Sequence, residues 1–349
     1  MKEKIIEEKV FEAIMDMAEN GMLSNEDNIE TVMQKLEEAV TAPKPLKIKN
    51  IYINNSLVCR EICKLKNIAR GSRSLEVKTM PRNGEDGIVC VEVEYRTADV
   101  GESEPVSITM WDKAVMDAVY TLVKNGYVVA TSQMIARVMN GSTEQHICRQ
   151  KVEKVENSLN KLGRLFVRID ASNEFYTRDV EMGGVLEGYL FNYQKVEITK
   201  PVNREKVDAW FLSPTVLYLY ASAIKQIINA PFEYRQTQDV LKNRDDVIIV
   251  RDYLICRIEN MKNSKNRMRS NYISYEWYDK ENERVAGMFA DLGIYPKDYS
   301  NWKKKKGKID TVVEALLEEF KAKGIIDNYI KRTNDGVIGR KNLGYEIVV

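Results

Sequence analysis

The chain has 349 residues, of which 44% are apolar and 30% are charged, with only 8 prolines and 18 glycines. This composition excludes a disordered, collagen-like or disulfide-stapled protein, and the length favours about two domains. No apolar run approaches the ~18 residues that a transmembrane helix needs, and glutamates interrupt the start of the chain where a secretory signal would be apolar. We therefore expect a cytoplasmic protein with no membrane partner.

Cysteine and histidine usage restricts the chemistry. Only Cys59 and Cys63 are close in sequence, and no second cysteine pair or neighbouring histidine could complete a zinc site. We expect five buried thiols in a reducing compartment: Cys59, Cys63, Cys90, Cys148 and Cys256. The single histidine, His146, excludes a histidine-cluster metal site, and the chain lacks the G-x4-G-K-[ST] sequence of P-loop ATPases. The prediction is no metal and no cofactor.

Charge is distributed unevenly, although the net charge of the whole chain is only +1. Residues 1–41 carry four lysines and eleven carboxylates, a net charge of −7, which leaves +8 on the remainder. Apolar periodicity predicts two helices, over residues 4–20 and 24–40, and Pro43 and Pro45 then form a linker. We interpret residues 1–45 as an acidic helical hairpin arm attached to a body with affinity for polyanions.

Residues 46–205 are predicted to form a first domain. A short helix near 57–65 and strands at 75–80 and 88–95 come first. Three helices follow, over 110–126, over 132–140 with Thr131 as the cap, and from Ser142 or Thr143 to Leu162. A strand at 164–170 and a turn into FYTRD (175–179) complete a helix-turn-helix with a β-wing, the winged helix.

Residues 243–349 repeat this pattern as a second domain. Helices are predicted over 245–261, 280–292 and 304–323, with a short strand at 273–277 and a C-terminal hairpin that ends in YEIVV. Residues 206–242 are expected to connect the two domains by a strand and a long apolar helix. The predicted fold class is therefore α+β, with two winged-helix domains in tandem, preceded by the helical hairpin and a small β segment.

The segment WKKKKGK (302–308) places five lysines at the start of the last predicted helix: Lys303, Lys304, Lys305, Lys306 and Lys308. Lysines there repel one another and oppose the helix macrodipole, so folding gives no reason for the placement. A DNA backbone does, because each lysine can neutralise a phosphate and release a counterion. The alternative, a solvated lysine run, is common on protein surfaces.

Further candidate DNA contacts surround the predicted helices. On the third helix of the first domain, Arg149 and Gln150 belong to the side-chain types that read guanine and adenine in a major groove. The pair His146 and Arg149 matches the H-x-x-R pattern of tyrosine recombinases, but we favour a non-catalytic phosphate or base contact. The complete remaining set comprises Gln145, Lys154, Lys262, Lys265, Arg267, Arg269, Tyr299, Lys331, Arg332, Arg340 and Lys341.

The order of elements carries a family resemblance. The segments VRDYLICRIENMKN, YISYEWYDKENERVAGMFADLG, DYSNWKKKKGKIDTVVEALLEEFKAKGIID and GYEIVV resemble the C-terminal winged helix of the tandem winged-helix plasmid replication initiators. The stretch from WDKAVMDAVYTLVKNG to FYTRD resembles their N-terminal winged helix more loosely, so the likeness covers about 240 residues. The acidic arm and the strands up to Ile108 are extra.

This resemblance implies a non-enzymatic, sequence-specific protein that binds repeated double-stranded DNA sites at a plasmid-type origin. It also implies a homodimer in one state that represses its own promoter, contacts with host replication proteins, and a nucleoid- or plasmid-associated location. Three alternatives stay open: a transcriptional regulator or partition adaptor without an initiation role, a DNA-breaking enzyme of the tyrosine-recombinase kind, and a structural protein that does not bind DNA.

Overall fold

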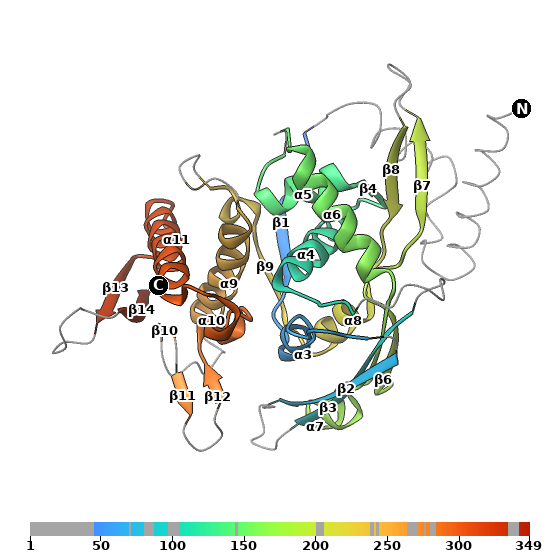
Figure 1. The fold of residues 1–349 in the computed structure, drawn as a ribbon, viewed down its shortest axis with the longest axis horizontal. Coiled ribbons are helices and arrows are strands. Elements are labelled where there is room, and N and C mark those ends of the chain that lie inside the picture. The colour runs from blue at the N-terminus through green and yellow to red at the C-terminus, as the bar shows by residue number, and fades with distance from the viewer. Residues whose placement is uncertain are drawn as a thin grey trace, which may run out of the picture.

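A computed structural model of the chain describes residues 45–69, 71–79, 87–96, 105–143, 146–199, 206–237, 241, 244–263, 271–275, 277–279, 284–333 and 342–349. The predicted helices of the acidic arm lie outside these residues. The described chain mixes helices with small antiparallel sheets (Figure 1), which confirms a fold that combines α and β elements. We call residues 45–237 the first unit and residues 244–349 the second unit.

The first unit is built around three helices whose ends follow the local sequence. They are α4 (Met110–Lys124), α5 (Ser132–Asn140) and α6 (Arg149–Leu162). The backbone N–H of Thr109 donates to the Asp112 carboxylate at 2.8 Å and the Thr131 hydroxyl accepts from the N–H of Met134, so both predicted starts are capped. Gly141 ends α5 in the left-handed conformation, with φ 70°.

A three-stranded sheet accompanies these helices. β4 (Val129–Thr131) pairs with β8 (Lys206–Phe211), and β8 pairs with β7 (Lys195–Thr199). The strand between α4 and α5 therefore lies beside the last strand of this sheet. β8, which the sequence placed in a connecting segment, completes this sheet.

The second unit contains a set of helices and strands in the same order as α4, β4, α5, α6, β7 and β8 of the first. Its elements are α9 (Asp245–Lys262), β10 (Tyr272–Ser274), α10 (Met288–Asp291), α11 (Trp302–Ala322), β13 (Asn328–Thr333) and β14 (Asn342–Val348). The sheet order β10-β14-β13 matches β4-β8-β7, because in both sheets the strand that follows α4 or α9 pairs with the last strand of that sheet. A short hairpin, β11 (Trp277–Asp279) and β12 (Arg284–Ala286), and a 3-10 helix (Pro296–Asp298) interrupt this order.

A second, four-stranded sheet belongs to the first unit. Its order is β2-β3-β5-β6, formed by Gly71–Thr79, Gly87–Tyr95, Leu165–Asp170 and Val185–Tyr189. The predicted strand at 164–170 is confirmed, but the predicted wing at FYTRD is wrong. There the chain forms a short helix, α7 (Ser172–Thr177), which buries Phe175 against the sheet, and β5 pairs with β3 instead.

The first unit also contains a two-stranded sheet. β1 (Asn50–Asn54) pairs with β9 (Ile227–Pro231), and α3 (Leu57–Ile62), α8 (Val216–Ala223) and a 3-10 helix (Phe232–Tyr234) flank them. The apolar helix expected between the domains is α8, and it is shorter than predicted. It ends at Ala223, and Lys225 adopts φ 57°, which turns the chain into β9.

Three other predictions need correction. The third helix of the first unit begins at Arg149 rather than at Ser142 or Thr143, with the exposed Cys148 at its N-cap. The segment 280–292 was expected to be one helix, but its described part forms β12 followed by the short helix α10. Cys90 and Cys148 are exposed, so only three of the five thiols are buried, because β3 turns Cys90 to its solvent face.

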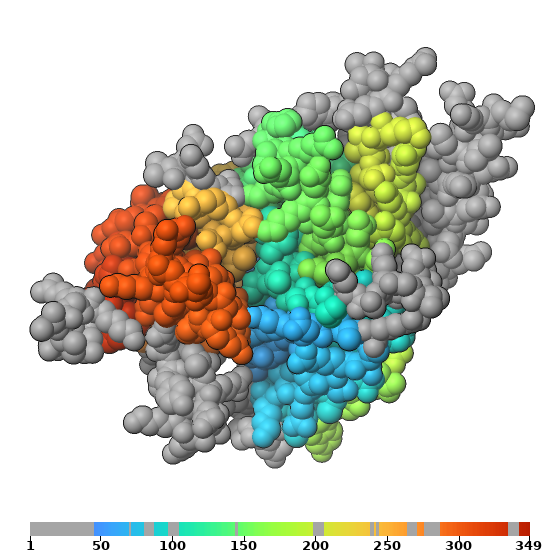
Figure 2. Space-filling model, viewed as in Figure 1, coloured from blue at the N-terminus to red at the C-terminus, as the bar shows by residue number. Residues whose placement is uncertain are grey.

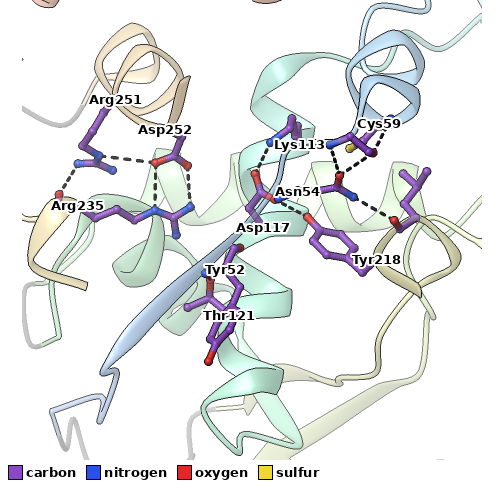
Figure 3. A network of polar contacts seen from close by, with 12 residues as sticks. Tyr52, Asn54, Cys59, Lys113, Asp117, Thr121, Tyr218, Arg235, Arg251 and Asp252 are labelled. Carbon is purple, nitrogen blue, oxygen red and sulfur yellow. Dashed lines mark hydrogen bonds and ion pairs between the residues drawn. The ribbon is translucent and has the colours of Figure 1, made fainter. Parts of the chain in front are cut away.

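Buried polar contacts hold the two units together where α9, which lies between α11 and the helices of the first unit, meets that unit (Figures 1 and 2). Arg235 and Arg251 are fully buried and both face Asp252, with Arg235 Nη2 2.7 Å from Asp252 Oδ2 (Figure 3). Arg251 also donates to the carbonyls of Arg235 and Met139, which links α9 to the end of α5. Within the described residues, no helix is both long enough and apolar enough to cross a membrane.

Candidate nucleic-acid interface

The first turns of α11 divide the lysine run into two groups. Lys303, Lys304 and Lys308 are exposed, and within the described residues none of them has an ion-pair partner. The Asn301 side chain caps this helix by accepting from the N–H of Lys304 at 2.9 Å. The first turn contains no acidic residue, so three uncompensated cations stand where the macrodipole favours an anion.

Lys305 and Lys306 turn toward the protein. Lys305 Nζ lies 2.7 Å from Asp246 Oδ1 and 5.2 Å from the centre of the Tyr299 ring. Lys306 Nζ lies 5.7 Å from the centre of the Phe289 ring. The sequence grouped all five lysines together, but only three of them are displayed without an internal partner.

The second half of α11 carries carboxylates that the fold itself satisfies. Glu314 pairs with Lys331 at 3.2 Å, and Glu318 accepts a hydrogen bond from the Tyr329 hydroxyl at 2.6 Å. Strand β13 thus covers the acidic half of the helix. Lys331 is engaged there, and Arg332 pairs with Glu346, so these two predicted DNA contacts already have internal partners.

Asp310 anchors α11 to its sheet. Its Oδ1 accepts from the hydroxyls of Tyr275 at 2.7 Å and Tyr345 at 2.9 Å, and from the Asn342 amide at 2.5 Å. Burial alone would raise the pKa of Asp310, but these hydrogen bonds and the charge of Lys331 outweigh it and hold the pKa below its ordinary value. These hydrogen bonds of Asp310 therefore fix the orientation of the helix turns that carry the lysines.

Gly307 leaves the displayed face of α11 bare. It is exposed between Lys304 and Lys308, and a Cβ added there would meet nothing within 4 Å. Glycine inside a helix is destabilising, and neither packing nor a left-handed φ requires it here. A glycine at such a position permits close approach of another molecule to the helix backbone.

The candidate residues of α6 are displayed at its start. The side chain of Arg149 is 91% exposed, and its Nε lies 2.7 Å from Glu153 Oε1 in an ion pair. Gln150 is exposed beside it. Lys154 pairs with Asp245 and lies 4.1 Å from the centre of the Trp111 ring. His146 is exposed but precedes the helix, because α6 begins later than predicted.

Sequence reasoning missed two side chains on this helix. Asn157 and Asn160 are exposed, and both continue the stripe that runs from Arg149 through Glu153 at spacings of three and four residues. Asparagine is among the residues that pair with adenine in a major groove. The helical spacing was the signal that could have found them.

Lys262 lies at the end of α9, away from both helix starts. Its Nζ donates to the Tyr234 hydroxyl at 3.1 Å and pairs with Glu259 at 3.2 Å. Burial would lower the pKa of Lys262, but these two partners outweigh it and raise the pKa. Lys265, Arg267, Arg269, Gln145, Arg340 and Lys341 lie outside the described residues.

Metal-ligating side chains do not gather in the part of the chain that the structure describes: no group of three or more histidine, cysteine or carboxylate residues is placed to hold an ion. The chemistry that the described surface offers is cationic and amide-bearing, suited to phosphate and base edges.

No protein-family model matches the sequence, and no curated protein matches it. Two solved structures of RctB domains 2 and 3 superpose on the chain. One gives a TM-score of 0.40 at 7% identity, covering 90% of this chain and 96% of that chain. The other, a selenomethionine derivative, gives 0.36 at 8% identity, covering 80% and 91%. Because both TM-scores are low, neither likeness decides the fold or the function of this chain.

Proposed function

We propose that this protein binds double-stranded DNA through the exposed starts of α11 and α6, as a sequence-specific replication initiator of a plasmid or other mobile element. The observation that carries the proposal is the set of three exposed, unpaired lysines, Lys303, Lys304 and Lys308, at the start of α11. A surface cation without a partner can bind phosphate without first breaking an internal contact.

The two units support this proposal as winged helices. Each contains a helix, a strand, two helices and two strands that follow one another along the chain, with β5, α7 and β6 inserted in the first unit and β11 and β12 in the second. Each three-stranded sheet pairs its first strand with its last. In a winged helix the third helix is the one that enters the major groove, which would make α6 and α11 the recognition helices. The division into domains 46–205, 206–242 and 243–349 is part of the same proposal, except that β8 (Lys206–Phe211) belongs to the first domain because it pairs with β4 and β7.

The mechanism is binding without catalysis. The displayed lysines neutralise phosphates and set the affinity, while Arg149, Gln150 and Asn157 on α6 are placed to contact base edges. Two recognition helices in one chain would cover two major-groove segments about one helical turn apart. Repression of the protein's own promoter by a homodimer and recruitment of host replication proteins complete the proposed role.

Salt dependence of binding tests the proposal. The triple variant Lys303→Ala, Lys304→Ala, Lys308→Ala should bind any duplex more weakly, and the slope of log K against log salt should flatten by up to about 2.7, at about 0.9 per lost phosphate contact. Its matched control replaces three lysines that are exposed on other elements, Lys49, Lys78 and Lys225, with alanine. Equal slopes for the two triple variants would remove α11 from the interface.

A regulator or partition adaptor without an initiation role is the alternative built on the same folds. Selection from a random duplex library, followed by footprinting on the DNA that flanks the gene, separates the two. Several direct repeats support an initiator, whereas a single inverted repeat supports a regulator.

A further inference from the structure

The first turn of α9 links the two proposed recognition helices. Asp245 pairs with Lys154 of α6, and the next residue, Asp246, pairs with Lys305 of α11 at 2.7 Å. Two consecutive carboxylates thus each hold a lysine from a different unit. We name Asp245 and Asp246 the aspartate pair.

Folding explains the aspartates but not their lysine partners. Acidic residues in the first turn of a helix are favoured by the macrodipole wherever their side chains point. The side chains of Lys154 and Asp245 are each 45% exposed, whereas Asp246 is 34% and Lys305 18% exposed. Ion pairs that water reaches contribute little to stability, so the fold does not depend on either pair.

A carboxylate offers a lysine the same kind of partner that a phosphate does, an anionic oxygen acceptor. Both lysines stand on helices that also carry exposed cations, Arg149 on α6 and Lys303, Lys304 and Lys308 on α11. A duplex that reached Lys303 and Lys304 would bring its phosphates to the neighbouring Lys305, where it would meet Asp246 already in place.

We propose that the aspartate pair is an internal competitor of DNA phosphate: it occupies Lys154 and Lys305 in the free protein and gives them up when DNA binds. This inference rests on the proposed function. This competition weakens binding to every duplex. A DNA site is then occupied only if contacts to its bases add to the binding energy. Because one helix turn holds both lysines, the restraint acts on both units.

The competition has a signature in salt dependence. When a phosphate takes Lys305, DNA releases a counterion, but the freed Asp246 attracts a cation from solution. The two effects partly cancel, so a paired lysine adds less to the salt slope than a free one. Replacing Asp246 with asparagine removes the cation uptake, so the salt slope becomes steeper. Removing a negative charge elsewhere on the protein leaves the slope unchanged.

The experiment compares Asp246→Asn with Asp298→Asn on a random-sequence duplex. Asp298 lies shortly before α11 and pairs with Lys66 at 2.6 Å, so its loss removes the same charge nearby without freeing a candidate DNA contact. We expect Asp246→Asn to bind up to about fivefold more tightly, with a slope steeper by up to ~0.9, and Asp298→Asn to keep the original slope. Asp245→Asn should behave like Asp246→Asn.

A second variant ties the gain to its lysine. Adding Lys305→Ala to Asp246→Asn should abolish the gain in affinity and return the slope to that of the unchanged protein or below. Thermal unfolding checks that the asparagine variants are folded. Equal gains from Asp246→Asn and Asp298→Asn with unchanged slopes would overturn the inference, and so would a gain that survives Lys305→Ala.

Failure of this inference is distinguishable from failure of the proposed function. Lys303, Lys304 and Lys308 have no carboxylate partner within the described residues, so their triple alanine variant reports on DNA binding independently of the aspartate pair. If that variant flattens the slope while Asp246→Asn leaves it unchanged, DNA binding stands and the aspartate pair is not a competitor. If the unchanged protein shows no salt-dependent binding, both proposals fail.

Discussion

Replacing Gly307 with alanine should make the protein more stable and a weaker DNA binder. The added methyl group would meet no atom within 4 Å, so packing neither opposes nor favours it. What remains is the intrinsic preference of helices for alanine, because glycine in a helix interior costs about 0.5–1 kcal/mol relative to alanine. We therefore expect the free energy of unfolding to rise by that amount.

The effect on binding has the opposite sign if DNA approaches the helix at this point. A methyl group between Lys304 and Lys308 would have to be accommodated against the DNA, at a cost of about 1 kcal/mol or more, which is about a fivefold or larger rise in Kd. Urea unfolding and fluorescence anisotropy with a labelled duplex measure the two quantities. A variant that gains stability and binds as tightly as the unchanged protein would refute close approach of DNA at Gly307. A variant that loses stability would refute the claim that a methyl group at this position meets no other atom.

Three further predictions concern the fold. Asp252→Ala leaves the buried Arg235 and Arg251 without their carboxylate and should lower the free energy of unfolding by about 3–5 kcal/mol, as measured by urea unfolding. Asp310→Asn should cost about 1–3 kcal/mol at pH 7. Because the native pKa of Asp310 lies below its ordinary value, its stabilisation is present above about pH 4 and is lost as pH falls through the native pKa, so the variant should lose less stability on acidification. Gly141→Ala should cost about 2 kcal/mol or more, because φ is 70° and the new Cβ would lie 2.1 Å from the carbonyl oxygen of Arg235.

Matched variants separate the causes. Gly126 also has a positive φ, 86°, but a Cβ there would meet nothing within 4 Å, so Gly126→Ala isolates backbone strain from overlap. Equal losses at Gly126 and Gly141 would contradict the packing argument. For Asp252, the accessible Asp298 is the control, and a loss under about 1 kcal/mol from Asp252→Ala would show that the two arginines find other partners or water.

Helices were predictable from local sequence where a cap and an apolar stripe coincide. Thr131 and Gly141 mark ends that the sequence predicted and the structure confirms, because capping needs only residues within one turn. The start predicted at residue 110 is also confirmed, and Thr109 caps it. The start of α6 was not predictable in the same way. Ser142 and Thr143 are good cap residues, yet the helix begins at Arg149 after an exposed Cys148 that offers no side-chain cap bond.

The wing was misplaced because strand pairing is not local. The run at 165–170 is a strand as its alternation indicates, but alternation does not state which neighbour a strand will take. It pairs with β3, 70 or more residues earlier in the chain, as at Tyr95 and Leu165 or Val91 and Ile169, while β4 pairs with β8. The other edge of β5 pairs with β6, so neither edge is left for FYTRD, where the chain forms α7 instead.

The sequence by itself determined which residue types gather where: a run of five lysines, an acidic start, and the apolar stripes of two similar sets of elements. Only the tertiary structure decided which of those charges are available. Asp246 lies 59 positions from Lys305, and Asp245 lies 91 positions from Lys154, so no local pattern reveals their pairing. The physical reason is that helix periodicity acts within a few residues, whereas the accessibility of a charge depends on whichever side chains the packed helices bring beside it.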